Sequence, residues 1–158
     1  MKILLLGGSG FVGGHLARRL ADEDHTITIV TRYKPATRHL ALVPGVRICQ
    51  FDPYDPERLA QELDGHDALI NLVGILNERG FSGKGFKRAH VELVETAIKA
   101  CRSAGVSRFL QMSALKAGEG QSHYLTSRGE GEQRVRTSGL RWTIFRPSTI
   151  FGPDDSFL

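Results

Sequence analysis

The sequence has few of the residues that mark a metal, disulfide or membrane protein. Its two cysteines, Cys49 and Cys101, lie in a strand-like and a helix-like pattern without ligand spacing. This predicts buried, reduced thiols and a cytoplasmic setting. Six scattered histidines form no metal-binding motif, so we predict no metal site. The apolar run Leu4-Leu5-Leu6 is too short for a signal peptide, and nothing approaches the roughly 20 apolar residues of a membrane helix.

The sequence also has only a small excess of positive over negative charge. Lysine and arginine number 21 against 17 aspartates and glutamates, a formal net charge of +4. The basic residues are dispersed, apart from Arg18-Arg19 and the group Arg32, Lys34 and Arg38. An anionic cofactor and a solvated surface explain this pattern better than a nucleic-acid-binding patch, so we expect no nucleic-acid partner.

What the sequence does contain is an alternation of strand and helix patterns. The composition, 41% hydrophobic and 24% charged, suits a single domain over residues 1–158. Six strands separated by helices predict an α/β fold with a doubly wound parallel sheet, ordered 3-2-1-4-5-6. Strands are predicted at 1–6, 26–30, 46–51, 68–73, 109–112 and 142–145. Helices are predicted after the first glycines and at 38–43, 56–63, 86–103 and 122–138.

A glycine-rich turn follows the first strand. It fits two spacings at once, Gly7-x-x-Gly10-x-x-Gly13 and Gly8-x-Gly10-x-x-Gly13. Either spacing lets bare backbone approach a pyrophosphate at a helix N-terminus. The alternative is a glycine turn without a ligand, which the strand before it and the helix after it disfavour. The turn therefore predicts a bound dinucleotide.

The end of the second strand indicates which dinucleotide. A carboxylate there hydrogen-bonds the ribose 2′-hydroxyl of NAD, whereas arginine accommodates the 2′-phosphate of NADP. The chain reads Val30-Thr31-Arg32-Tyr33-Lys34, with Arg38 following. Ordinary solvated arginines are the alternative. We expect NADP(H) in preference to NAD(H), with Arg32 and Arg38 as binding residues.

Two further strand ends are candidates for the adenosine half. Asp52, after the third strand, can accept from the adenine amino group or simply cap the turn before Pro53, and the sequence leaves these two roles open. At the end of the fourth strand, Leu72-Val73-Gly74 can lie against the ribose.

Tyr124 and Arg128 form the most specific chemical pair. Their i, i+4 spacing puts both on one helix face. Tyrosine becomes a useful acid or base when a neighbouring cation favours its phenolate. Taken alone, such a pair is more often surface decoration. Ser113, after the fifth strand, is a candidate donor to a substrate carbonyl or else an ordinary loop hydroxyl.

Together these residues resemble the atypical branch of the short-chain dehydrogenase/reductase superfamily, within the NAD-dependent epimerase/dehydratase group. The similarity is strongest to the group that holds the nucleotide-binding accessory subunit of respiratory complex I and its bacterial relatives. Its landmarks run along the whole chain in family order: 7–14, 70–78, 111–115, 124–132 and 146–153.

The resemblance implies roles for individual residues. The glycines bind pyrophosphate, Arg32 reads the 2′-phosphate, and Pro147 and Ile150 lie by the nicotinamide. His90, Ser113, Tyr124 and Arg128 stand at or beside the Asn, Ser, Tyr and Lys positions of the superfamily tetrad. Cofactor contacts are also implied for Ser9, Phe11, Val12, His90, Met112, Tyr124 and Arg128.

Two departures from the family pattern affect the functional prediction. Arginine in place of lysine keeps the charge but cannot pass a proton on, so binding should survive the change more easily than turnover. Family members also continue for on the order of 150 further residues that bind a substrate or a partner. The end of this chain therefore reads as a truncation, and its last residues as the entrance to further structure.

Two functions follow as hypotheses. The first is an NADP(H)-dependent oxidoreductase or epimerase that acts on an unidentified small molecule through Tyr124. The second is a non-catalytic NADP(H)-binding module that joins a protein partner such as a respiratory complex, in the cytoplasm or at the periphery of a membrane complex.

Overall fold

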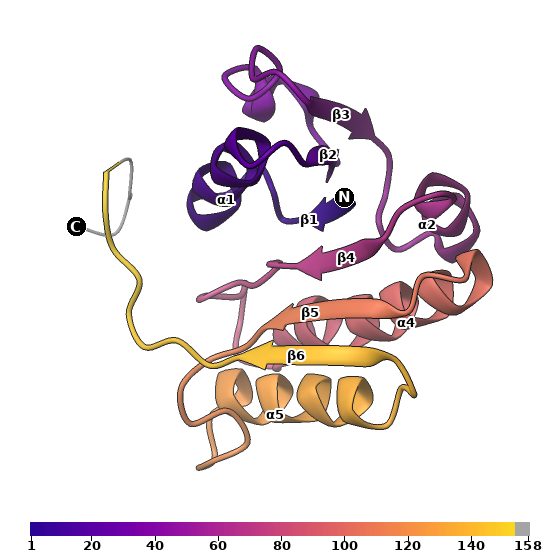
Figure 1. The fold of residues 1–158 in the computed structure, drawn as a ribbon. Helices are drawn as coiled ribbons and strands as arrows, with labels where there is room; N and C mark the ends of the chain where they lie inside the picture. Colours follow the sequence, from indigo (N-terminus) through magenta and orange to yellow (C-terminus); the bar gives the residue numbers. More distant parts are fainter. Residues whose placement is uncertain (154–158) are drawn as a thin grey trace.

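Six parallel strands form the centre of the molecule, in the order β3-β2-β1-β4-β5-β6 (Figure 1). The computed structural model describes residues 1–153, apart from the side chain of Ala36. Both the predicted doubly wound α/β fold and the predicted strand order are confirmed. The strands are β1 (Lys2–Leu6), β2 (Thr26–Thr31), β3 (Val46–Gln50), β4 (Ala68–Asn71), β5 (Arg108–Met112) and β6 (Arg141–Phe145).

The helices connect consecutive strands. They are α1 (Phe11–Asp22), the 3-10 helix η1 (Lys34–Thr37), α2 (Pro56–Leu63), α3 (Lys84–Lys87), the π-helical turn η2 (Arg88–Glu92), α4 (Leu93–Ala104) and α5 (His123–Arg136). Local signals set several of their ends. The Asp55 side chain caps α2 and the Ser122 hydroxyl caps α5, while Gly105 ends α4 in the left-handed conformation.

Alternating side chains of β1 supply two cores, one on each face of the sheet. Leu4 and Leu6 pack with residues of α2, α4 and α5, whereas Ile3 and Leu5 pack with Ala17 of α1. Both sets are buried because β1 lies in the middle of the sheet. The same arrangement brings the carboxyl ends of the strands to one edge, where such folds bind ligands.

The predicted helix at 38–43 is wrong. The chain instead forms η1 and then separate turns, with Leu40 N–H bonded to Thr37 O and Val43 N–H to Leu40 O. Thr37 also donates its hydroxyl to Lys34 O at 2.7 Å, which closes η1. Pro44 follows so closely that a regular helix has no room to continue, and successive turns suffice to bury Leu40.

The predicted helix at 86–103 exists but contains the π turn η2. A Cβ atom at Gly131 of α5 would lie 2.1 Å from the His90 carbonyl oxygen. The glycine therefore allows α5 to approach the backbone of this turn closely. Hydrophobic periodicity alone does not distinguish a π turn from an α-helix, so the sequence did not reveal it.

The segment after β6 crosses the carboxyl edge of the sheet towards α1 (Figure 1). Leu115 N–H donates to Pro147 O at 2.8 Å, and His15 Nε2 lies 2.9 Å from Pro153 O. Residues 154–158, the end of the segment expected to lead into further structure, lie outside the described residues.

Candidate dinucleotide site

The glycine turn between β1 and α1 has the geometry of a phosphate-binding loop. Gly7 adopts φ +79°, and a Cβ atom at Gly13 would lie 2.4 Å from the Gly7 carbonyl oxygen, so both positions need glycine for the fold itself. Gly10 is different, because a Cβ atom there would meet only Gly7 O, at 3.4 Å. Gly10 caps α1 without a side-chain hydrogen bond, and the first turn of α1 holds no acidic residue. The first N–H groups of α1 therefore remain available to an anion.

A first hollow of about 490 Å³ opens beside this turn. It extends over the ends of β2 and β4, which is where the adenosine half of a dinucleotide is expected. The structure brings to it seven predicted residues: Gly7, Ser9, Gly10, Arg32, Leu72, Val73 and Gly74.

Two predicted residues do not line this hollow. Arg38 is exposed on the turns that follow η1. Asp52 is exposed, and its Oδ1 accepts a hydrogen bond from Tyr54 N–H at 3.2 Å, which is the turn-capping alternative. Their proposed contacts with the cofactor stay predictions.

The first hollow also contains residues that the sequence reasoning missed. Arg88 of η2 lies over the ring of Tyr54, with 4.5 Å between its Cζ and the ring centroid, and Tyr54 donates its hydroxyl to Arg88 O at 3.1 Å. Arg32 and Arg88 are the only charged residues that line the hollow, and neither pairs with a carboxylate within residues 1–153. Tyr54 follows a strand end, which was a signal available in the sequence. Nothing in the sequence marked Arg88.

A second hollow, of about 500 Å³, lies on the other side of the glycine turn. Eight predicted residues from four separate parts of the chain line it: Phe11, Val12, Met112, Ser113, Tyr124, Arg128, Pro147 and Ile150. Because Phe11 and Val12 follow Gly10 directly, a ligand that spans the turn reaches both hollows.

Tyr124 and Arg128 lie together, as their spacing predicts. The Arg128 Cζ is 5.4 Å from the centroid of the Tyr124 ring. Its Nη1 donates to Met112 O at 3.1 Å and lies 3.4 Å from Val73 O, so the guanidinium bridges the ends of β4 and β5. Burial lowers the pKa of Arg128, and the neighbouring Tyr124 phenol opposes that change.

Gly74 makes room for this guanidinium. A Cβ atom on Gly74 would lie 1.9 Å from Arg128 Nη2. The residue predicted to lie against the ribose therefore also decides where Arg128 sits. Position 74 must be glycine because Arg128, 54 positions further along the chain, occupies the space that a side chain would need. No local pattern in the sequence revealed this.

Ser113 lines the second hollow but is only 4% exposed. Its hydroxyl lies near enough to Glu132 to help lower the pKa of that carboxyl, yet Oγ has no hydrogen-bond partner of normal geometry within the described residues. A buried hydroxyl without a partner is destabilising, so a ligand that supplies one would bind favourably.

His90 lies behind the second hollow and does not line either one. Its Nε2 accepts from Ile75 N–H at 3.2 Å, and its Nδ1 is 2.9 Å from the Ser127 hydroxyl, which itself donates to Tyr124 O. Since the Ser127 proton is engaged, His90 must carry its own proton on Nδ1. Burial, with a contribution from Arg128, lowers the pKa of His90 to about 3. His90 thus acts as a neutral brace between the Ile75 loop and α5, and the direct cofactor contact expected for it stays a prediction.

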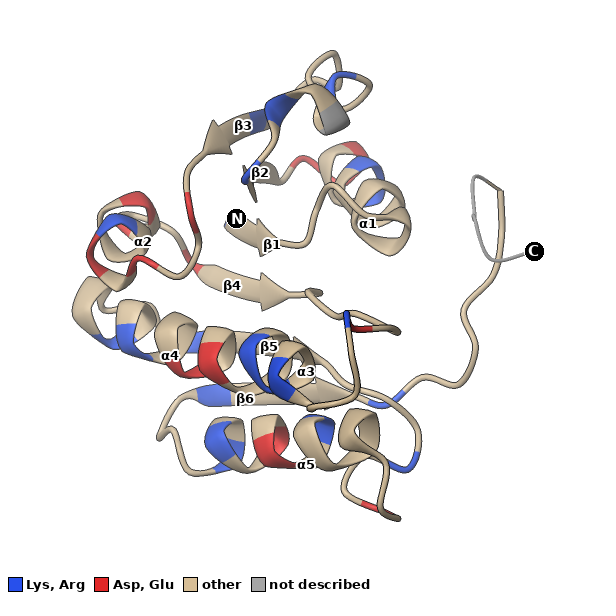
Figure 2. Cartoon of the chain, turned by 180° about the vertical axis from the view of Figure 1, so that it is seen from behind, with Lys and Arg blue, Asp and Glu red and all other residues tan. Residues whose placement is uncertain are grey.

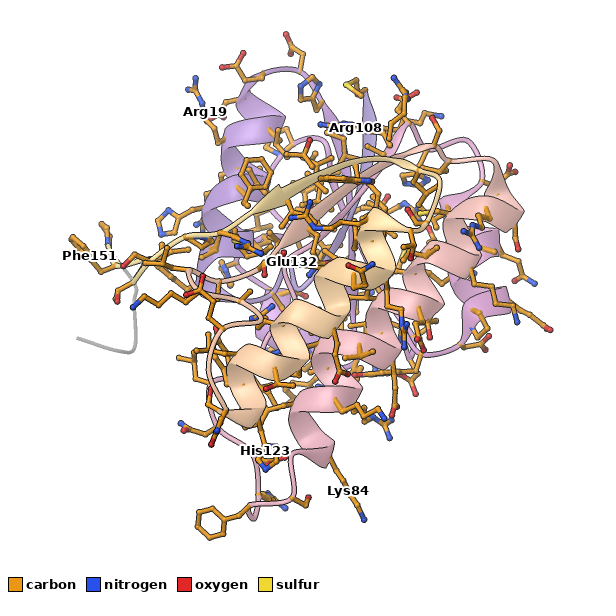
Figure 3. The ribbon with its side chains drawn as sticks, turned by 90° about the horizontal axis from the view of Figure 1, so that it is seen from below. Arg19, Lys84, Arg108, His123, Glu132 and Phe151 are labelled. Atoms are coloured by element: carbon orange, nitrogen blue, oxygen red, sulfur yellow. The ribbon has the colours of Figure 1, made fainter. Side chains whose placement is uncertain are left out.

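Glu132 holds the segment that contains Pro147. It lies one turn beyond Arg128 on α5 and is 3% exposed. Arg146 donates to it through Nε at 2.8 Å and Nη2 at 2.6 Å. Burial alone would raise the pKa of Glu132, but the hydrogen bonds from Arg146 hold it below its usual value of 4.5. Figure 3 shows Glu132 between α5 and β6, whereas Phe151 points away from the rest of the molecule.

A second carboxylate with two arginine partners, Glu62 beside Arg47 and Arg58, lies outside both hollows. In Figure 2, Lys and Arg are spread over α1, β3, α4 and α5, with Asp and Glu among them on the helices. No group of His, Cys, Asp and Glu within residues 1–153 is arranged to hold a metal ion. None of the helices in that range is long and apolar enough to cross a membrane.

The sheet order, the glycine turn and the two hollows define a dinucleotide-binding protein of the Rossmann class. The chain belongs to the NAD(P)H-binding family, whose family model matches residues 7–155. Its glycine turn fits the cofactor that this family binds, as do Arg32 and Arg88, which pair with no carboxylate among residues 1–153.

Relatives and solved structures support this assignment. Ceramide reductase of Caulobacter vibrioides is 30% identical over 98% of this chain and 48% of its own length. The NADH dehydrogenase [ubiquinone] 1 alpha subcomplex subunit 9 of Arabidopsis thaliana is also 30% identical, over 98% of this chain and 39% of its own. UDP-glucuronic acid 4-epimerase from Bacillus cereus, solved with NAD, shares the fold with a TM-score of 0.83 at 19% identity, over 97% of this chain and 58% of its own.

These findings confirm the resemblance to the complex I subunit group and to epimerase/dehydratase proteins. Membership of the NAD(P)H-binding family is therefore established. The chain spans about half the length of most of the relatives described above.

Proposed function

We propose that this protein binds NADP(H) across the two hollows and transfers a hydride between the cofactor and a carbonyl or alcohol substrate. The observation that carries the proposal is the second hollow, where Ser113, Tyr124 and Arg128 meet beside the N-terminus of α1. A bound nicotinamide would supply or accept the hydride. The relative named ceramide reductase supports the reductive direction.

The preference for NADP(H) rests on the first hollow. Arg32 and Arg88 line it, and no carboxylate within residues 1–153 lines it to accept from a ribose 2′-hydroxyl. A guanidinium can instead donate charge-assisted hydrogen bonds to a 2′-phosphate. Arg32 directly follows β2, so it is the residue we assign to this contact.

Tyr124 is the proposed proton donor and acceptor. In the reductive direction its phenolic O–H donates a proton to the substrate oxygen as the carbonyl carbon receives the hydride. The Ser113 hydroxyl would donate a hydrogen bond to the same oxygen. The Arg128 charge, held beside the Tyr124 ring by two backbone carbonyls, would stabilise the phenolate that remains.

A non-catalytic role is the second candidate, and one observation favours it. Arg128 Nη1 is engaged by Val73 O and Met112 O, which suits a structural bridge as well as a catalytic cation. In this case bound NADP(H) would stabilise the fold for a protein partner, as the complex I relatives suggest. Placement in the cytoplasm or beside a membrane complex stays part of this proposal.

Single-turnover oxidation of bound NADPH by a panel of small carbonyl compounds distinguishes the two candidates. With full-length protein, we expect Tyr124→Phe to abolish oxidation while NADPH still binds, because the transferred proton is lost. Arg128→Lys should preserve or raise the rate. Thr126→Val, which removes an exposed hydroxyl from the same helix, is the matched control.

Each outcome decides between the hypotheses. Substrate-dependent oxidation that persists in Tyr124→Phe would eliminate the tyrosine mechanism. If no carbonyl compound oxidises bound NADPH, the non-catalytic role becomes the better explanation.

A further inference from the structure

The second hollow is lined by more apolar than polar residues. Eight of its residues are apolar: Phe11, Val12, Leu76, Met112, Ala114, Leu115, Pro147 and Ile150. The polar residues are Ser113, Tyr124, Arg128, Ser148 and Thr149, and no carboxylate of residues 1–153 lines the hollow. Arg128, the one charged residue in the part of the lining that the structure describes, already donates to backbone carbonyls.

Three of the apolar side chains form an exposed rim. Leu76 is 64% exposed, Leu115 53% and Ile150 41%. They come from the loop after β4, the loop after β5 and the segment after β6, so the sheet topology gathers them at one edge. Apolar side chains gathered around a hollow are typical of a ligand-binding surface.

The reactive end of the hollow is small and polar. Ser113 is buried, its Oγ has no hydrogen-bond partner of normal geometry among residues 1–153, and Tyr124 lies in the same lining. The Tyr124 hydroxyl suits one oxygen atom of a ligand, and the Ser113 hydroxyl can bond the same atom once its side chain rotates into the hollow. A polyhydroxylated substrate would leave several of its hydroxyls against apolar side chains, where each unmade hydrogen bond is unfavourable.

We infer that the substrate is an apolar ketone, or the secondary alcohol derived from it, with a single oxygen at Tyr124 and a hydrocarbon body along the Leu76, Leu115 and Ile150 rim. The inference rests on the proposed function and names its substrate class. The carbonyl carbon gains the hydride and the carbonyl oxygen gains the Tyr124 proton. The ketone becomes an alcohol as NADPH becomes NADP⁺.

The test uses full-length protein, NADPH and the ketones butan-2-one, octan-2-one and undecan-2-one, with dihydroxyacetone as the polar comparison. We expect kcat/KM to rise roughly fourfold for each methylene that enters the hollow. Dihydroxyacetone should react more slowly than butan-2-one.

Two rim variants, Leu76→Ser and Leu115→Ser, should lower kcat/KM for undecan-2-one at least fivefold more than they lower it for butan-2-one. Leu42→Ser is the matched control, since Leu42 is 87% exposed and lies outside the hollow. Using two separate rim positions keeps the test valid if one variant folds poorly.

The results separate this inference from the proposed function. Tyr124-dependent turnover that is independent of chain length, or that favours dihydroxyacetone, would overturn the apolar substrate and leave the oxidoreductase standing. The same holds if both rim variants lower the melting temperature without changing the chain-length dependence, because the rim would then be covered by protein. No oxidation of bound NADPH by any ketone would overturn both proposals.

Discussion

The Gly10→Ala variant should weaken dinucleotide binding while leaving the stability of the fold nearly unchanged. Gly10 has φ −83° and ψ 174°, which any residue adopts, and a Cβ atom there meets only Gly7 O at 3.4 Å. Replacing an N-cap glycine by alanine is unfavourable, whereas the lower entropy of the unfolded chain favours alanine by about 0.4–1 kcal/mol. These effects oppose each other, so we expect the free energy of unfolding to change by less than about 1 kcal/mol.

The same methyl group would lie where the pyrophosphate must approach the turn. A hydrogen bond to a charged group contributes about 1.5–3 kcal/mol, and displacing the phosphate would lose at least one such bond. We therefore expect NADPH affinity to fall at least tenfold, which corresponds to about 1.4 kcal/mol. Isothermal titration calorimetry with full-length protein measures the affinity, and thermal melting followed by circular dichroism verifies the fold.

The chain offers a matched control and a contrasting variant. A Cβ atom at Gly14 would find its nearest neighbour, His39 Nε2, at 3.8 Å, so Gly14→Ala should fold well and bind normally. Gly13→Ala should unfold the turn, because its Cβ atom would lie 2.5 Å from Gly8 Cα. Unchanged NADPH affinity in a folded Gly10→Ala variant would show that this turn is not the phosphate site.

Three further predictions test other parts of the site. Arg32→Ala should weaken NADP⁺ binding roughly 10- to 150-fold, as expected for a lost charge-assisted contact, and should barely change NAD⁺ binding. Arg19→Ala, on the exposed surface of α1, is the control. Equal affinity of the unmutated protein for NADP⁺ and NAD⁺ would refute the preference. In the native protein burial lowers the pKa of His90 to about 3, against an ordinary value of 6.5. Between pH 7 and pH 5 the unfolded chain therefore takes up a proton at His90 that the native protein does not. The free energy of unfolding should fall over this range, by up to about 1.4 kcal/mol per pH unit. Urea unfolding should show a smaller slope in His90→Gln, and an unchanged slope would contradict a neutral His90. Burial raises the pKa of Cys101 to about 12, so iodoacetamide at pH 8 should label Cys101 in urea but not in the native protein, as mass spectrometry can show.

Much of the fold was predictable because its determinants are local. Short apolar runs, the glycine turn, Ser122 and Gly105 marked strands and helix ends correctly. The strand order then followed from the general preference for doubly wound parallel sheets. Once the order was known, the carboxyl ends of the strands identified the edge where the site lies.

The rest depended on contacts between distant segments. The turns at 38–43 form because Leu40 can be buried without a helix, and the π turn forms where Gly131 admits the His90 carbonyl. Arg88 lines the first hollow only because this turn and Tyr54 meet there. None of these contacts leaves a periodic signal in the sequence.

One face of α5 connects the parts of the second hollow. Three residues follow one another on this face at four-residue intervals: Tyr124, Arg128 and Glu132. Tyr124 lines the hollow, and Arg128 bonds to backbone at the ends of β4 and β5. Glu132 holds the segment after β6 through Arg146. Both backbone carbonyls accept from Arg128 Nη1, while Nη2 occupies the space that a side chain at Gly74 would need. Arginine at this position therefore ties the location of Tyr124 to the sheet, at the expense of a group that can pass a proton on.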